Sequence, residues 1–106
     1  MDYKKLTEDL KQAKELARIA AQGEDGGTAN LDSFVLRLPR ARESKVLEAI
    51  KEAGCYCRGK TDWFGTCYFI SCGYGGQGNA QTRAVTAMEK FMTKQGYKAD
   101  IFYKAD

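Results

Sequence analysis

The sequence contains no histidine, and this absence removes a large part of enzyme chemistry. Histidine is the commonest general base near neutral pH and the usual partner of a serine or cysteine nucleophile. Carboxylates are present, but Asp25 and Asp32 lie in predicted loops, where aspartate ordinarily forms turns and caps. We therefore expect a protein that is not an enzyme, with no catalytic residues and no cofactor. An enzyme that uses carboxylates alone is the open alternative.

Long apolar runs are also missing. No stretch approaches the roughly 20 residues that are needed to span a bilayer, and residues 1–5 carry charges instead of the apolar core of a signal peptide. We therefore expect a soluble, cytoplasmic protein with no membrane partner. A single proline and an apolar share of 43% in 106 residues indicate one globular domain, because disordered chains are poorer in apolar residues.

Hydrophobic periodicity predicts three helices and four strands. The expected helices cover residues 3–22, 41–53 and 80–95, and the expected strands cover residues 33–38, 55–60, 66–72 and 98–104. After the first helix the order is β-α-β-β-α-β, the split pattern of the ferredoxin-like fold. The predicted class is thus α+β: an amphipathic helix at residues 1–22, then a ferredoxin-like sandwich at residues 31–106. Its antiparallel sheet has the strand order 4-1-3-2, with two helices on one face. The likeness is one of architecture, and this fold hosts many unrelated functions.

The expected topology brings the loop before the first strand close to a glycine-rich stretch at residues 73–78. That stretch leads into the last helix, whose free N–H groups and positive dipole end favour an anion. The predicted ligand-binding residues of this loop site are Asn30, Asp32, Tyr74, Gln77, Asn79 and Arg83. The stretch matches neither the P-loop nor the dinucleotide fingerprint. The alternative is that its glycines only let the chain turn from strand to helix.

A second candidate site is the outer face of the sheet. Residues 37–60 hold seven basic residues against three glutamates, although the net charge of the chain is only +3. Strand alternation puts basic residues and aromatic rings on the same side, an arrangement that the RNA-recognition motif uses to stack bases and hold phosphates. The predicted nucleic-acid-binding residues are Arg37, Tyr56, Arg58, Lys60 and Phe69. The aromatic signature of that motif is missing, because residues 64–69 supply only its glycine and misplaced rings. The competing interpretation is that the N-terminal helix or a second copy of the chain covers this face.

Four cysteines raise the question of zinc: Cys55, Cys57, Cys67 and Cys72. Alternate residues of a strand are about 6.5 Å apart, whereas two sulfurs on a tetrahedral zinc are about 3.8 Å apart. Cys67 should also face the opposite side from the other three. We therefore expect no metal site and buried, reduced thiols. A cross-strand disulfide from Cys72 to Cys55 or Cys57 is geometrically conceivable.

These patterns predict a small non-enzymatic binding or regulatory module that recognises an anionic ligand. The ligand would be nucleic acid on the sheet face, or a nucleotide or other phosphate-bearing small molecule at the loop site. The alternative is a regulator or inhibitor that acts on a larger protein partner, such as an accessory (anti-defence) protein of a phage or mobile element. The N-terminal helix would then be a candidate homodimer interface.

Overall fold

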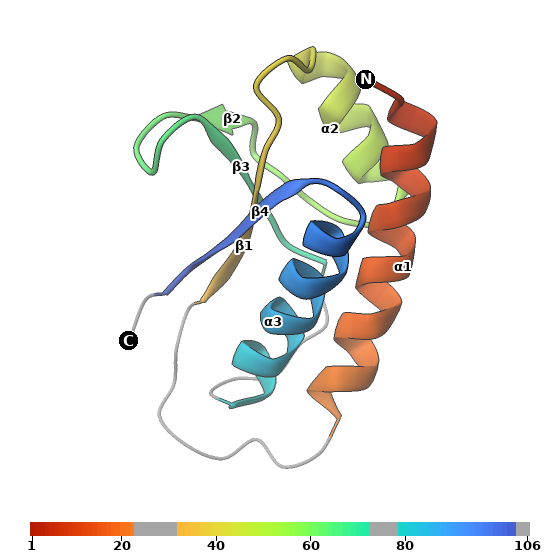
Figure 1. Cartoon of the computed structure of the whole chain (residues 1–106), viewed down its shortest axis with the longest axis vertical. Coiled ribbons are helices and arrows are strands. Elements are labelled where there is room, and N and C mark those ends of the chain that lie inside the picture. The colour runs from red at the N-terminus through yellow and green to blue at the C-terminus, as the bar shows by residue number, and fades with distance from the viewer. Residues whose placement is uncertain (23–31, 73–78, 104–106) are drawn as a thin grey trace.

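The structure is a computed structural model, and it describes residues 1–22, 32–72 and 79–103. In chain order its elements are α1 (Tyr3–Ala21), β1 (Ser33–Arg37), α2 (Glu43–Glu52), β2 (Lys60–Thr61), β3 (Cys67–Ile70), α3 (Asn79–Lys94) and β4 (Lys98–Phe102) (Figure 1). The predicted α+β class is confirmed. The element that differs most from its prediction is the second strand, which shrinks to two residues and an isolated bridge at Tyr56.

The four strands form one sheet in the order β2-β3-β1-β4, and each strand is antiparallel to its neighbours. Phe34 lies between Ile70 and Ile101, and Leu36 lies opposite Tyr68. Because directly opposed residues project to the same face of a sheet, these apolar side chains share the face that carries the helices. They form one continuous core with the helices.

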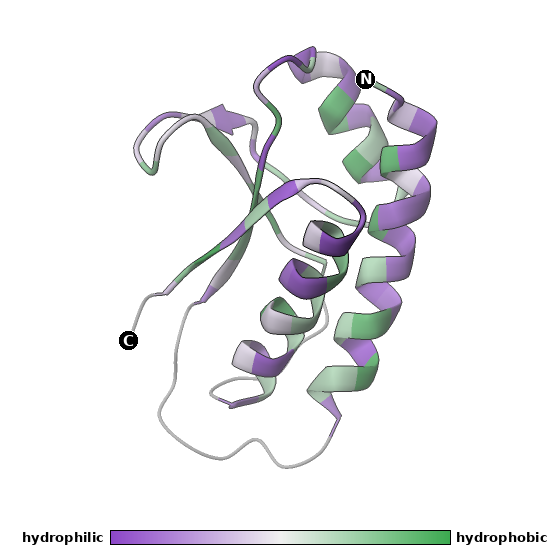
Figure 2. Ribbon diagram, viewed as in Figure 1, coloured by the Kyte–Doolittle hydropathy of each residue, from purple (hydrophilic) through white to green (hydrophobic). Residues whose placement is uncertain are grey.

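The helices cover this face with amphipathic stripes. In α1 the stripe consists of Leu6, Leu10, Ala13 and Ala17, spaced by three or four residues and fully buried. The contributions of the other two helices include Val46, Ile50, Ala84, Val85, Met88 and Met92. Hydrophobic and hydrophilic residues alternate along each helix accordingly (Figure 2). The carboxylate of Asp2 accepts the Lys5 N–H at 3.0 Å and so caps the start of α1.

One of the two expectations for α1, that it covers the outer face of the sheet, is wrong. The helix does not lie across the outer sheet face but against α2 and α3, on the side of the sheet that these helices cover (Figure 1). Two tyrosines support this position: the Arg42 N–H donates to the Tyr3 hydroxyl at 2.8 Å, and the Tyr97 hydroxyl donates to Asp9 at 2.8 Å. A homodimer through α1 stays a prediction, and it would have to use the exposed side of this helix, because the apolar stripe is buried inside the chain.

Candidate binding site on the outer sheet face

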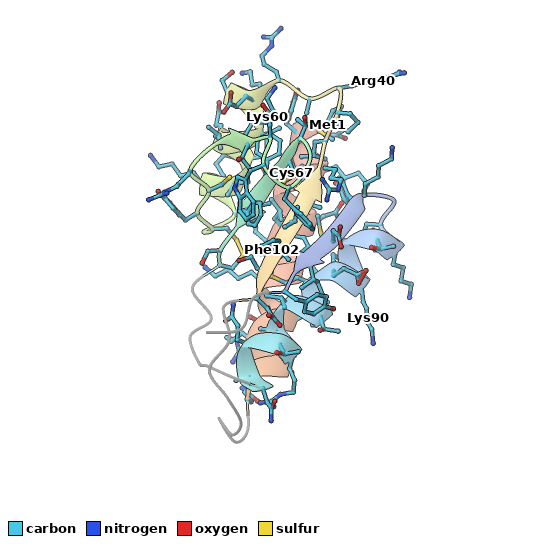
Figure 3. All side chains as sticks on the ribbon, turned by 90° about the vertical axis from the view of Figure 1, so that its left-hand side faces the viewer. Met1, Arg40, Lys60, Cys67, Lys90 and Phe102 are labelled. Atoms are coloured by element: carbon cyan, nitrogen blue, oxygen red, sulfur yellow. A yellow bond between two sulfur atoms is a disulfide. The ribbon has the colours of Figure 1, made fainter. Side chains whose placement is uncertain are left out.

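The face of the sheet opposite the helices carries a cluster of aromatic rings that reaches across three strands. We call Trp63, Phe64, Phe69 and Phe102 the aromatic cluster. The Trp63 ring is stacked on Phe69 of β3 at 5.0 Å and meets Phe102 of β4 edge-on at 4.8 Å, measured between ring centroids. Since β1 lies between β3 and β4, the connection from β2 to β3 folds back over the sheet. Figure 3 looks onto this face, with Phe102 labelled near its middle and α1 behind the strands.

This connection buries residues that a bare sheet face would expose. Val35 of β1 and Cys67 of β3 are both 0% exposed, although neither belongs to the core beneath the helices. The sequence analysis assigned Phe69 to this face, whereas its predicted strands at residues 55–60 and 66–72 left Trp63 and Phe64 in the connection between them. Two consecutive aromatic residues in a short hairpin connection were the signal that was missed, because such rings are rarely left fully in water.

Arg37 attaches the β2–β3 connection to the sheet. Its guanidinium donates to the Phe64 carbonyl oxygen at 2.8 Å and pairs with the Asp100 carboxylate at 3.3 Å, and it lies 4.9 Å from the centroid of the Phe64 ring. A Cβ atom on Gly65 would come within 2.8 Å of Arg37 Nη1, and Gly65 has a φ of +67°. The position therefore favours glycine. Arg37 lies on the predicted face, but its charge and both of its terminal nitrogens already have partners.

A bulge divides the predicted second strand. Tyr56 and Ser71 exchange two backbone hydrogen bonds of 2.7 and 2.9 Å, whereas Lys60 lies opposite Tyr68. Between these two pairs, three residues separate Tyr56 from Lys60, whereas two separate Ser71 from Tyr68. The strand that contains Tyr56 and Lys60 therefore has one residue more than its partner. Gly59, with a φ of +140°, lies in this stretch.

The bulge reverses the alternation of faces, because a shift of one residue in register moves side chains to the other side of a sheet. Tyr56 shares the outer face with Ser71, but Lys60 aligns with Tyr68 on the helix side. The Lys60 N–H also donates to Glu43 of α2 at 2.9 Å. The prediction that Tyr56, Arg58 and Lys60 share one face is therefore wrong for Lys60.

A hollow of about 330 Å³ opens on the outer face beside the aromatic cluster. Its rim carries two rings that are unusually exposed for their size, Tyr56 at 64% and Trp63 at 65%. We call this the sheet-face hollow, and it is lined by Tyr56, Arg58, Gly59, Thr61, Trp63, Phe69, Ile70 and Ser71. Three predicted nucleic-acid-binding residues, Tyr56, Arg58 and Phe69, thus come together.

The side chains that line the sheet-face hollow suit a flat ligand that carries negative charge or is rich in electrons. The rings offer faces for stacking, and the hydroxyls of Thr61 and Ser71 both donate and accept hydrogen bonds. Arg58 is exposed, and in the part of the chain that the structure describes it forms no ion pair. Its five donors are therefore available to a phosphate or carboxylate.

The predicted loop site is described only in part. Asn30, Tyr74 and Gln77 lie outside the described residues. Asp32 is buried, and its carboxylate accepts from the Thr82 hydroxyl at 3.2 Å.

The two other described residues of the loop site lie in α3. Asn79 is exposed and begins the helix. The Arg83 guanidinium donates to the carbonyl oxygens of Ala20 and Ala21 at 2.8 and 3.3 Å, so it neutralises the C-terminal end of α1. Asp32 and Arg83 thus both tie α3 to its neighbours.

Two of the cysteines form a disulfide, Cys55 with Cys72, with Cα atoms 4.2 Å apart. The expectation of reduced thiols therefore fails for this pair, and the cross-strand alternative holds. Cys57 and Cys67 are free, and burial raises the pKa of both thiols. Among the described residues no three or more His, Cys, Asp and Glu side chains are placed to share a metal ion.

Comparison with protein-family models, curated proteins and solved structures found no match to this chain. Within the described residues, no helix is both long and apolar enough to cross a membrane.

Proposed function

We propose that this protein is a non-enzymatic module that binds single-stranded nucleic acid on the outer face of its sheet. In this proposal one base enters the sheet-face hollow and stacks on Tyr56 or Trp63, while Arg58 holds the adjacent phosphate. A base stacked on an aromatic side chain contributes about 1–3 kcal/mol, largely independent of sequence. The main supporting observation is that Tyr56 and Trp63, both more than 60% exposed, flank one hollow together with Arg58, which forms no ion pair with the described residues.

The architecture supports the proposal. The order β2-β3-β1-β4 is the expected order 4-1-3-2 read from the other edge, so we infer a variant of the ferredoxin-like fold. The variant differs in its additional helix α1, in the two-residue β2 and in the aromatic connection folded over the sheet. In the RNA-recognition motif, bases stack on the same face of such a sheet.

The loop site is less suited to an anion. Arg83, the cation predicted there, is hydrogen-bonded to the end of α1. A larger hollow of about 390 Å³ between α1 and α2 is lined by lysines and glutamates in similar number. Opposite charges side by side leave little net attraction for an anionic ligand.

The second candidate function is the regulation or inhibition of a protein partner through the same face, as an accessory protein of a phage or mobile element would act. The observation in its favour is the composition of the hollow's rim, since tyrosine, tryptophan and arginine are also the residues that dominate binding energy in protein interfaces.

A titration distinguishes the two candidates. Fluorescence anisotropy of labelled poly-uridine and poly-thymidine oligonucleotides is measured at increasing salt, with wild type and with Tyr56→Ala. We expect binding that weakens with salt, by about 0.7 in log K per log salt unit for each phosphate contact. Y56A should weaken it about tenfold, because it removes one stacking surface. Absence of binding at low salt would contradict the proposal and favour the protein partner.

A further inference from the structure

The disulfide closes the loop of chain that carries the described lining of the sheet-face hollow. Within the part of the chain that the structure describes, all lining residues fall in the stretch from Tyr56 to Ser71. Cys55 directly precedes this stretch and Cys72 directly follows it, and the two are bonded to each other. The covalent link therefore joins the two ends of the segment that carries the proposed site.

The disulfide also lies next to the contact that holds the two walls of the hollow together. One wall consists of Tyr56, Arg58 and Gly59, and the other of Phe69, Ile70 and Ser71. The only strand pairing between these walls in the described chain is the Tyr56–Ser71 bridge, with hydrogen bonds of 2.7 and 2.9 Å. Regular pairing of β2 with β3 begins only at Lys60, beyond the bulge. An isolated bridge next to a bulge is a weak attachment, so the disulfide supplies much of the connection.

We propose that the Cys55–Cys72 disulfide is a redox clasp of the sheet-face hollow: the oxidised protein binds its ligand, and reduction separates the wall that carries Tyr56 and Arg58 from β3. The inference rests on the proposed function, since it concerns the regulation of the same site. We expect the fold to persist when the disulfide is reduced, because α1, α2, α3, β1 and β4 lie outside the closed loop.

The reducing step is a thiol–disulfide exchange with a dithiol. Its thiolate attacks Sγ of Cys55, which is partly exposed, whereas Cys72 is only 3% exposed. The Cys55–Cys72 bond breaks, and Cys72 leaves as a thiolate that takes up a proton. The second thiol of the reductant then displaces Cys55 from the mixed disulfide and becomes oxidised with the first. Two electrons and two protons pass to the protein.

The test has two readouts. The first is backbone amide hydrogen exchange of the free protein, oxidised and reduced. We expect the Tyr56 and Ser71 amides to lose protection on reduction, while the amides around Val85 in α3 keep theirs. Unchanged protection at Tyr56 and Ser71 overturns the inference. Loss of protection throughout α3 also overturns it, because the disulfide would then hold the whole fold.

The second readout is affinity for a labelled poly-uridine oligonucleotide, with a Cys55→Ser/Cys72→Ser double variant beside the reduced protein and Cys57→Ser as the matched control. If about one reduced molecule in ten keeps the hollow closed, the dissociation constant rises about tenfold. We expect this rise for the reduced and the double-variant proteins, and none for C57S.

Equal affinity of the oxidised and reduced forms overturns the redox inference and leaves the proposed function standing. Absence of binding by either form overturns the proposed function and, with it, the redox control of binding. In that case the amide exchange still shows whether the disulfide clasps the hollow, so the two failures are distinguished.

Discussion

Trp63 meets Phe102 edge-on with ring centroids 4.8 Å apart, although Trp63 lies in the β2–β3 connection and Phe102 lies in β4 at the opposite edge of the sheet. This contact brings the connection over β3 and β1, and Val35 of β1 is fully buried. It also places Trp63 on the rim of the sheet-face hollow. One side chain thus contributes to stability and to the proposed site, and the two contributions can be measured separately.

Replacing Trp63 with alanine should destabilise the fold. The ring contacts of Trp63 with Phe69 and Phe102 are each worth about 0.5–1.5 kcal/mol, so W63A should lower the free energy of unfolding in urea by about 2 kcal/mol. Tyr56→Ala is the matched control, because Tyr56 is as exposed as Trp63 and has no ring contact among the described residues. Equal losses in the two variants would contradict the structural role of Trp63.

Replacing Gly65 with alanine should destabilise the fold more than the same change at Gly96. Both glycines have positive φ, +67° and +99°, which an alanine adopts only with backbone strain, of about 1–2 kcal/mol in the left-handed helical region. Among the described residues, a new Cβ at Gly96 has no neighbour within 4 Å, whereas at Gly65 it would lie 2.8 Å from Arg37 Nη1 and so disturb the bond from Arg37 to Phe64. Urea unfolding of G65A and G96A measures the loss of unfolding free energy in each variant. Equal losses would show that the contact of Arg37 with Phe64 does not stabilise the β2–β3 connection.

Replacing Tyr68 with phenylalanine should leave the stability unchanged or raise it. The Tyr68 hydroxyl is buried without a hydrogen-bond partner among the described residues, and such a group costs about 1–3 kcal/mol. Tyr97→Phe is the contrasting control, because the Tyr97 hydroxyl donates to the Asp9 carboxylate at 2.8 Å. We expect thermal unfolding to show a lower melting temperature for Y97F and not for Y68F, and a clear drop for Y68F would contradict the destabilising role of its buried hydroxyl.

The protein should lose stability at alkaline pH. Burial raises the pKa of Tyr97, and the hydrogen bond to Asp9 raises it further. Since the folded-state pKa lies above the unfolded value of about 10, the unfolded chain loses this proton first. The contribution of Tyr97 is therefore complete below pH ~10 and decreases as the pH rises above it. Unfolding free energies measured from neutral to alkaline pH should fall less steeply in Y97F, and identical slopes would contradict the assignment.

The helices and strands that could be predicted from the sequence were those whose apolar residues recur at a regular spacing. The stripe from Leu6 to Ala17 and the alternation in β1 and β3 led to the right elements and to the outer position of Phe69. The stripe of α1 did not show which layer it would cover, because a helix face and a sheet face offer similar apolar surface. Ala13 and Ala17 permit close packing against neighbouring helices, but they would also fit a sheet.

The features that were missed depend on single residues or on distant contacts. Gly59 inside a predicted strand was a signal for a bulge, and that bulge moves Lys60 to the other side of the sheet. Trp63 meets a residue almost forty positions away, and no local pattern predicts such a contact. For Cys72 the geometry suggested two partners, but pairing depends on redox conditions that the sequence does not state.

The most direct test of nucleic-acid binding compares two cations that the bulge separates. Arg58→Ala and Lys60→Ala each remove one positive charge, two residues apart, but Arg58 lines the sheet-face hollow whereas Lys60 aligns with Tyr68 on the helix side. Oligonucleotide affinity is measured by anisotropy across a range of salt concentrations. We predict that R58A binds more weakly and loses about 0.7 from the salt slope, the value of one phosphate contact, while K60A stays close to wild type. Equal effects of the two variants would contradict binding in the hollow and would indicate attraction by net charge alone.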